Sequence, residues 1–84
     1  MKIIIFVDFS SDEFNKDFQV SQELINLENT VLLVNNSVQL NSAYSSYDIL
    51  LLGNSFSGNI EFNNLKTINI KNLNIDDLLS RLVE

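Results

Sequence analysis

The chain has 84 residues, 11 acidic and five basic, and it contains no Cys, His, Pro or Trp. This length predicts one domain, residues 1–84. The missing residue types exclude thiolate and imidazole metal sites, disulfides and Cys or Ser-His nucleophiles, so we expect neither catalysis nor a cofactor.

Three nearly pure aliphatic runs, residues 3–7, 31–34 and 49–52, predict buried strands. Each run ends at once in a polar residue or glycine. A strand that lacks apolar/polar alternation must be covered on both faces. The runs are therefore typical of parallel strands in α/β folds.

Between the first two runs, the sequence predicts a helix that begins at Ser10 and runs to about Leu27. Ser10 and Glu13 have the spacing of a capping box, and Phe9 and Phe14 occupy the positions of a hydrophobic staple. Asn29 would end the helix in a left-handed cap. The stripe expected to face the core consists of Phe14, Phe18, Val20, Leu24, Ile25 and Leu27.

The second half of the chain predicts two helices and two strands. Residues 36–47 have helical apolar spacing but many Asn and Ser residues, so we expect a short, poorly packed helix, with a short strand that contains Val38 and Leu40 as the alternative. A strand at 48–53 and a loop at 54–64 follow. Residues 66–71 alternate and carry lysines at both ends, which predicts an edge strand. Residues 75–82 predict an amphipathic helix capped by Asn74.

Together these elements predict a small α/β fold, a four-stranded, mostly parallel sheet in the order 2-1-3-4, like half of a Rossmann or flavodoxin domain. Right-handed crossovers would place the first helix on one face and residues 36–47 on the other. The second face is then thinly covered, with only Phe56, Ile60 and Phe62 left to shield it. Either these side chains fold back over the sheet, or a partner or a second copy of the chain covers it in a homo-oligomer.

Acidic residues are concentrated in the N-terminal half, and no basic residue occurs between Lys16 and Lys66. We therefore expect no nucleic-acid binding, and a basic protein as partner. A solvated helix face would explain the same charges. No run reaches the ~18 apolar residues of a membrane span. The apolar run after Lys2 is too short for a signal peptide, so we expect a cytoplasmic protein without membrane contact.

Ligands of doubly wound sheets bind beyond the carboxyl ends of the strands. The residues predicted there are Asp8, Ser10, Ser11, Asn54, Ser55 and Ser57. Amides at the start of the first helix favour an anion, whereas the neighbouring acids repel a phosphate. Asp8 with Ser10 or Asn54 would suit a hard cation. Ordinary turn and cap chemistry explains the same residues.

The segment Tyr47-Asp48-Ile49-Leu50-Leu51-Leu52-Gly53-Asn54-Ser55-Phe56-Ser57-Gly58 resembles the third strand and following loop of flavodoxin-like domains. This resemblance implies a doubly wound parallel sheet. A flavodoxin-like phosphate loop would be rich in glycine after the first strand, whereas this chain has Asp8-Phe9-Ser10-Ser11-Asp12, so no flavin is expected. The acidic residues at the end of the first strand, Asp8, Asp12 and Glu13, resemble the acidic pocket of response-regulator receivers. The third strand, however, ends in Gly53-Asn54, so the position of the phosphorylatable aspartate lacks an acid.

We therefore predict a small acidic protein-binding protein without catalysis, acting as an inhibitor, an immunity-type antagonist or a phage-encoded modulator of a larger partner. The predicted charged contacts are Asp12, Glu13, Asp17 and Glu23, and the predicted apolar anchors are Tyr44, Tyr47, Phe56 and Phe62. The alternatives are a minimal flavodoxin-like ligand-binding domain or enzyme subunit, and a structural subunit of a homo-oligomer.

Overall fold

The computed structural model describes residues 1–58, 60 and 62–84. The predicted loop 54–64 includes residues 59 and 61, which lie outside the described residues. The elements in chain order are β1 (Lys2–Phe6), α1 (Phe14–Asn26), β2 (Thr30–Val34), α2 (Ser37–Ala43), the 3-10 turn η1 (Tyr44–Ser46), β3 (Ile49–Leu52), β4 (Lys66–Asn69) and α3 (Ile75–Leu82).

The strands form one four-stranded sheet in the order β2-β1-β3-β4, which confirms the predicted α/β fold and strand order. All three pairings are parallel, so the sheet is parallel throughout. Ile3 lies between Val31 and Ile49, and the register continues from there along both neighbours of β1. The β4 strand is at an edge, as its alternating pattern predicts.

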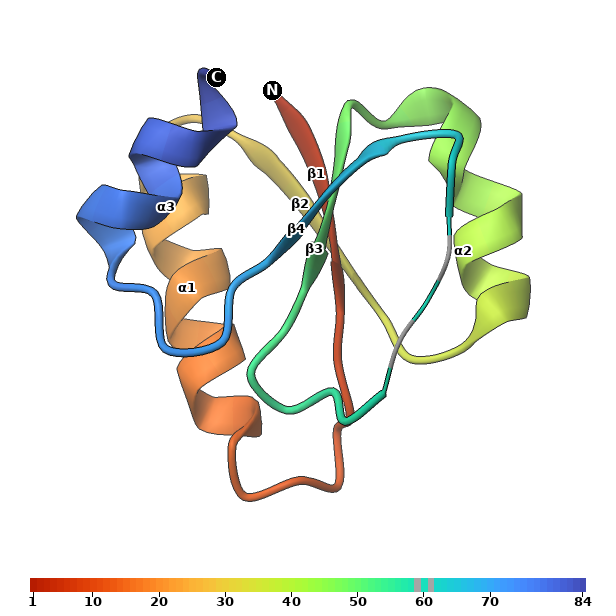
Figure 1. The fold of residues 1–84 in the computed structure, drawn as a ribbon, viewed down its shortest axis with the longest axis horizontal. Coiled ribbons are helices and arrows are strands. Elements are labelled where there is room, and N and C mark those ends of the chain that lie inside the picture. Colours follow the sequence, from red (N-terminus) through yellow and green to blue (C-terminus); the bar gives the residue numbers. More distant parts are fainter. Residues whose placement is uncertain (59, 61) are drawn as a thin grey trace.

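Helices cover both faces of the sheet, with α1 and α3 on one face and α2 on the other (Figure 1). Ile3, Ile5 and Leu51 point to the α1 face, whereas Ile4 and Leu50 point to the α2 face. All five side chains are buried. Complete burial of such a side chain stabilises the fold by about 1.5–3 kcal/mol, which explains why β1 and β3 contain no polar residue in their interior.

The α2 face is covered by the chain itself. The Phe56 ring packs edge-on against Phe6 with centroids 4.8 Å apart, and the Phe62 ring packs against Tyr44 at 5.3 Å. Leu65 and Ile60 join the same core. Of the two outcomes expected for this face, the structure shows the first: Phe56, Ile60 and Phe62 of the loop after β3 fold back over the sheet. This cover removes the argument that exposed apolar surface on this face requires a partner or a second copy.

The start of α1 differs from the predicted capping box. Ser10 does not cap the helix, because its backbone N–H and its hydroxyl both donate to Asp8 Oδ1, at 3.0 and 2.6 Å. The helix begins at Phe14 instead, and Ser11 Oγ accepts a hydrogen bond from the Glu13 amide. The predicted contact between Phe9 and Phe14 is present, with ring centroids 5.1 Å apart.

The end of α1 also differs in detail. Glu28, and not Asn29, adopts the left-handed conformation, with φ of 69°. The Glu28 amide donates to Ile25 O and the Asn29 amide donates to Leu24 O, which is the hydrogen-bond pattern of a Schellman motif. Asn29 adds a side-chain hydrogen bond to the same Leu24 carbonyl.

The helix also turns a different stripe to the core. Its buried residues are Asp17, Ser21 and Leu24, whereas Phe18 and Ile25 are 40% and 45% exposed. The predicted stripe is therefore wrong at Phe18, Ile25 and Leu27. The hydrogen bonds that draw Asp17 inward explain this rotation, because successive residues point about 100° apart around a helix.

Both helices predicted in the second half of the chain are present, but α2 covers only Ser37–Ala43 of the predicted range 36–47, and it packs on the core through Leu40. In α3, Asn74 caps the first turn by accepting a hydrogen bond from the Asp77 amide at 2.8 Å. In α2, Asn36 accepts from the Gln39 amide at 2.9 Å, and Leu40 is buried. Among the described residues, no helix combines the length and the apolar character needed to cross a membrane.

Candidate functional site

A buried carboxylate lies at the carboxyl end of the sheet, where a ligand would be expected. Asp17 of α1 is 0% exposed. Its Oδ1 accepts from the backbone and side-chain N–H groups of Asn54 at 2.6 and 3.1 Å. Its Oδ2 accepts from the amide and hydroxyl of Ser55 at 2.8 and 2.6 Å. The amides after β3 are thus occupied by an anion that the protein itself supplies.

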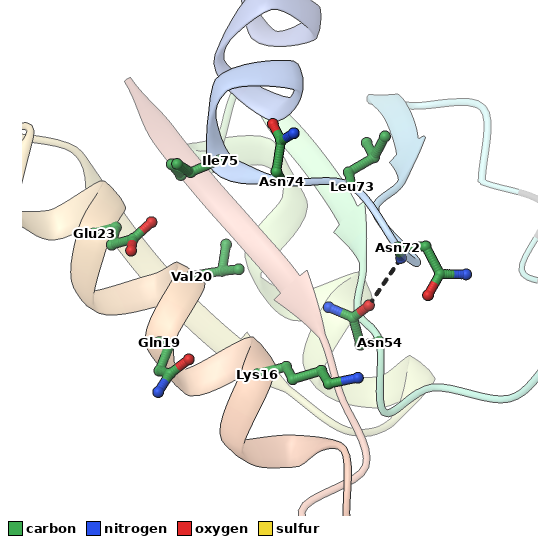
Figure 2. A pocket seen from close by; sticks show the side chains of 9 residues that line it. All are labelled: Lys16, Gln19, Val20, Glu23, Asn54, Asn72, Leu73, Asn74 and Ile75. Carbon is green, nitrogen blue, oxygen red and sulfur yellow. Dashed lines mark hydrogen bonds between the residues drawn. The ribbon is translucent and has the colours of Figure 1, made fainter.

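We call Asp17, Asn54 and Ser55 the Asp17 hub, because further segments converge on them. Ser55 Oγ also accepts from the Asp8 amide at the end of β1, at 2.8 Å. Asn54 Oδ1 accepts from the Asn72 amide in the turn between β4 and α3, at 3.2 Å (Figure 2). The hub therefore ties α1 to the ends of β1, β3 and β4.

Gly53 is required for this close packing. A Cβ atom at this position would lie 2.5 Å from Asp17 Oδ2 and 2.9 Å from the Phe6 carbonyl oxygen. Both atoms belong to groups held in place by hydrogen bonds. The glycine that ends the third aliphatic run is therefore needed for space.

Of the six predicted ligand residues, four make hydrogen bonds within the fold and two line a hollow. Asn54 and Ser55 are engaged with Asp17, and Ser10 and Ser11 hold the turn before α1. Asp8 and Ser57 do line a hollow of about 250 Å³ at the ends of the strands. The rest of its lining consists of Phe6, Val7, Asn35 and Phe56.

A larger hollow of about 340 Å³ lies between α1 and the turn before α3 (Figure 2). Val20, Leu73 and Ile75 supply its apolar lining, and Lys16 and Glu23 stand on its α1 side. Within the part of the chain that the structure describes, no group of three potential ligand side chains gathers closely enough to hold a metal ion. The hollow is thus a groove between packed elements, and amide side chains complete its lining.

The loop between β1 and α1, residues 8–13, projects beyond the ends of the strands (Figure 1). We call it the acidic loop, because Asp8, Asp12 and Glu13 are all exposed. The ring of Phe9 is 48% exposed beside them. Hydrogen bonds from the Ser10 hydroxyl and amide lower the pKa of the Asp8 carboxyl, so this residue keeps its negative charge. Lys16 pairs with Glu13 at 2.7 Å.

The structure separates the predicted partner-binding residues by accessibility. Asp12, Glu13 and Glu23 are exposed, but Asp17 is buried and is not part of the surface charge. The predicted apolar anchors are half-buried members of the α2-face core: Tyr47, Phe56 and Phe62 pack on it directly, and Tyr44 packs on Phe62. The exposed rings lie elsewhere, at Phe9 and Phe18.

A sequence signal for the buried Asp17 does exist. Asp17 precedes Ser21 by four residues and Leu24 by seven, so these three side chains share one helix face. An acid in line with a core leucine indicates a buried, hydrogen-bonded carboxylate. Its partners lie 37 and 38 residues away, however, and no local pattern identifies them.

Comparison with known proteins adds no further information on function: no family model, curated protein or solved structure matches the chain.

Proposed function

We propose that the chain is a small protein-binding module without catalytic activity, which recognises a basic surface on a larger partner through the acidic loop. The observation that carries this proposal is the half-exposed ring of Phe9 among three exposed carboxylates. An apolar ring supplies binding energy when it enters a pocket on the partner, and surrounding charges orient the approach. An inhibitor, an antagonist or a modulator of a host enzyme would use such a surface.

The internal order of the acidic loop supports this proposal. Asp8 O accepts from the Ser11 amide at 3.1 Å, and Ser11 O accepts from the Phe14 amide at 3.1 Å. The Phe14 ring supports one edge of Phe9. A loop that is already ordered loses little conformational entropy on binding, which favours affinity.

The charge of the loop supports a basic partner. Lys16 balances one of the carboxylates, Glu13, and among the described residues Asp8 and Asp12 have no ion-pair partner. Opposite charges on the partner would raise the association rate, and salt would weaken this effect because it screens exposed charges.

A comparative capture experiment tests the proposal. Tagged wild-type chain and a Phe9→Ala/Asp12→Asn variant are used as baits in an extract of the producing cells. The control is Asp76→Asn/Val83→Ala, which changes an exposed acid and an exposed apolar residue in and beside α3. We expect a protein that the wild type and the control retain and the loop variant loses, with weaker capture at high salt. Equal capture by all three baits would contradict the proposal.

The hollow at the strand ends supports a second proposal, a small ligand-binding domain. Its lining combines Asp8, Asn35 and Ser57 with two aromatic rings. A screen of nucleotides, flavins and divalent cations by thermal unfolding tests it. A bound ligand raises the melting temperature in proportion to the logarithm of its concentration, and a Ser57→Phe variant, which fills the hollow, should abolish the rise. No rise with any of these compounds would contradict ligand binding of these classes.

A further inference from the structure

The two edges of the sheet differ in how far they are protected from pairing with another strand. The β4 edge carries exposed lysines at and beyond its ends, Lys66 and Lys71, and such charges discourage pairing. The β2 edge has none: from Asn29 to Tyr47 the sequence contains no charged residue. The β2 edge is therefore uncharged, although the chain as a whole has a net charge of −6.

The backbone of β2 offers a defined set of hydrogen-bonding groups at this edge. The Thr30 amide donates to Met1 O, and Val34 O accepts from the Val7 amide, so Thr30, Leu32 and Val34 direct their backbone groups to β1. By alternation, Val31 and Leu33 direct theirs outward. Among the described residues, these outward groups have no hydrogen-bond partner, whereas the next outward amide, that of Asn35, donates to Gln39 Oε1 at 3.0 Å.

The flank of α1 beside this edge is also uncharged. Lys16, Val20 and Glu23 line the groove toward α3, so the side chains on the other side of the buried Asp17 and Leu24 face away from α3. Phe18 and Ile25 are on that side, and α1 packs against β2. Their exposed apolar surface therefore continues the surface of the β2 edge.

We infer that this edge pairs with the same edge of a second copy, β2 against β2 in antiparallel orientation across a twofold axis. Val31 then lies opposite Leu33 of the second copy, and the two pairs exchange four backbone hydrogen bonds. Leu32 lies on the axis opposite itself, as a pair without hydrogen bonds. Twofold symmetry by itself places Val31 opposite Leu33 of the second copy, because the outward backbone groups of these two residues are symmetric about Leu32.

Charge selects a second copy as the occupant. Two chains of net charge −6 repel each other over most of their surfaces, and they approach most favourably where neither carries charge. Thr30 to Val34 place only apolar side chains and one hydroxyl opposite one another, so no like charges meet across the new pairing. The result is a continuous eight-stranded sheet, with Phe18 and Ile25 of both copies beside the junction on the α1 face.

Single cysteines test both the association and its register, because the chain has no other cysteine. In Leu32→Cys, the two copies would bring Cα atoms about 4.5 Å apart, which suits a disulfide. In the control, Leu33→Cys, the equivalent atoms would be about 7–8 Å apart, at or beyond the limit for a disulfide. We expect mild oxidation to link Leu32→Cys into a dimer at least ten times faster than Leu33→Cys.

Sedimentation of the unmodified chain completes the test. We expect a species of twice the 9.6 kDa chain mass at high concentration. An Ile25→Glu variant should shift toward monomer, and the control Val83→Glu, at an exposed residue after α3, should not. A mass of one chain at all concentrations would overturn the inference, and so would a dimer in which Leu33→Cys links as fast as Leu32→Cys.

Discussion

Asp17 is the residue on which the carboxyl end of the sheet depends. It accepts four hydrogen bonds without exposure to solvent, and the two backbone donors among them have no other acceptor in these contacts. Hydrogen bonds to a charged group are stronger than those between neutral groups. In other doubly wound domains, ligands bind at this end of the strands. Here Asp17 occupies the backbone amides of Asn54 and Ser55, so these amides are not available to a ligand.

We predict that Asp17→Asn destabilises the protein by about 2–4 kcal/mol, because an amide nitrogen replaces one acceptor and leaves buried donors unsatisfied. The total stability expected for 84 residues is about 4–13 kcal/mol, so the loss is large. Urea unfolding followed by circular dichroism measures it.

The matched control for this substitution is Glu23→Gln, a change of the same chemistry at an exposed position of the same helix. It should alter the free energy of unfolding by no more than about 0.5 kcal/mol. Equal stability of Asp17→Asn and the wild type would show that the hub does not hold the strand ends.

At the scale of elements, α1 illustrates where sequence patterns are sufficient and where they are not. The aliphatic runs predict β1 and β3 because these strands are buried on both faces, and they predict β2 because its half-buried side chains pack on both faces at the sheet edge. The rotation of α1 could not be predicted in the same way. Phe18 and Ile25 fit the apolar stripe, but the four hydrogen bonds of Asp17 to a distant loop outweigh their burial.

The end of α1 supplies a prediction at this scale. Glu28 adopts a left-handed conformation that costs a residue with a Cβ atom about 1–2 kcal/mol relative to the right-handed one, a strain that glycine does not have. We predict that Glu28→Gly raises the free energy of unfolding by about 0.5–1 kcal/mol, after allowance for the greater freedom of glycine in the unfolded chain.

Thermal or urea unfolding measures this gain, with Glu23→Gly as the control in the interior of α1. That substitution should destabilise the protein by about 1 kcal/mol, since glycine is unfavourable within a helix. A loss of stability in Glu28→Gly would contradict the role assigned to Glu28 in the Schellman motif.

At the scale of the whole molecule, charge and apolar surface are segregated. The acidic loop lies at the carboxyl end of β1, whereas the uncharged β2 edge runs along one side of the sheet. In the inferred dimer the two sheets are antiparallel, so the two acidic loops lie at opposite ends. Pairing of the edges therefore leaves both loops accessible to a partner.

The sequence predicts the acidic character and the strand order of the molecule, but not which of its surfaces are exposed. Tyr47 and Phe56 are half-buried because the loop after β3 returns over the α2 face, and that return depends on contacts such as Phe56 with Phe6, 50 positions earlier. Phe9 and Phe18 are exposed because no distant segment within the described residues folds over their rings. The exposure of a side chain depends on packing between distant segments, so it cannot be predicted from a local sequence pattern.

Hydrogen exchange of the chain, alone and with the protein that it captures, tests most directly whether the acidic loop is the recognition surface. We predict that the captured partner slows amide exchange at residues 9–14 and leaves β2 and residues 54–58 unchanged. Protection confined to β2 or to residues 54–58, with unaltered exchange at residues 9–14, would contradict recognition by the acidic loop.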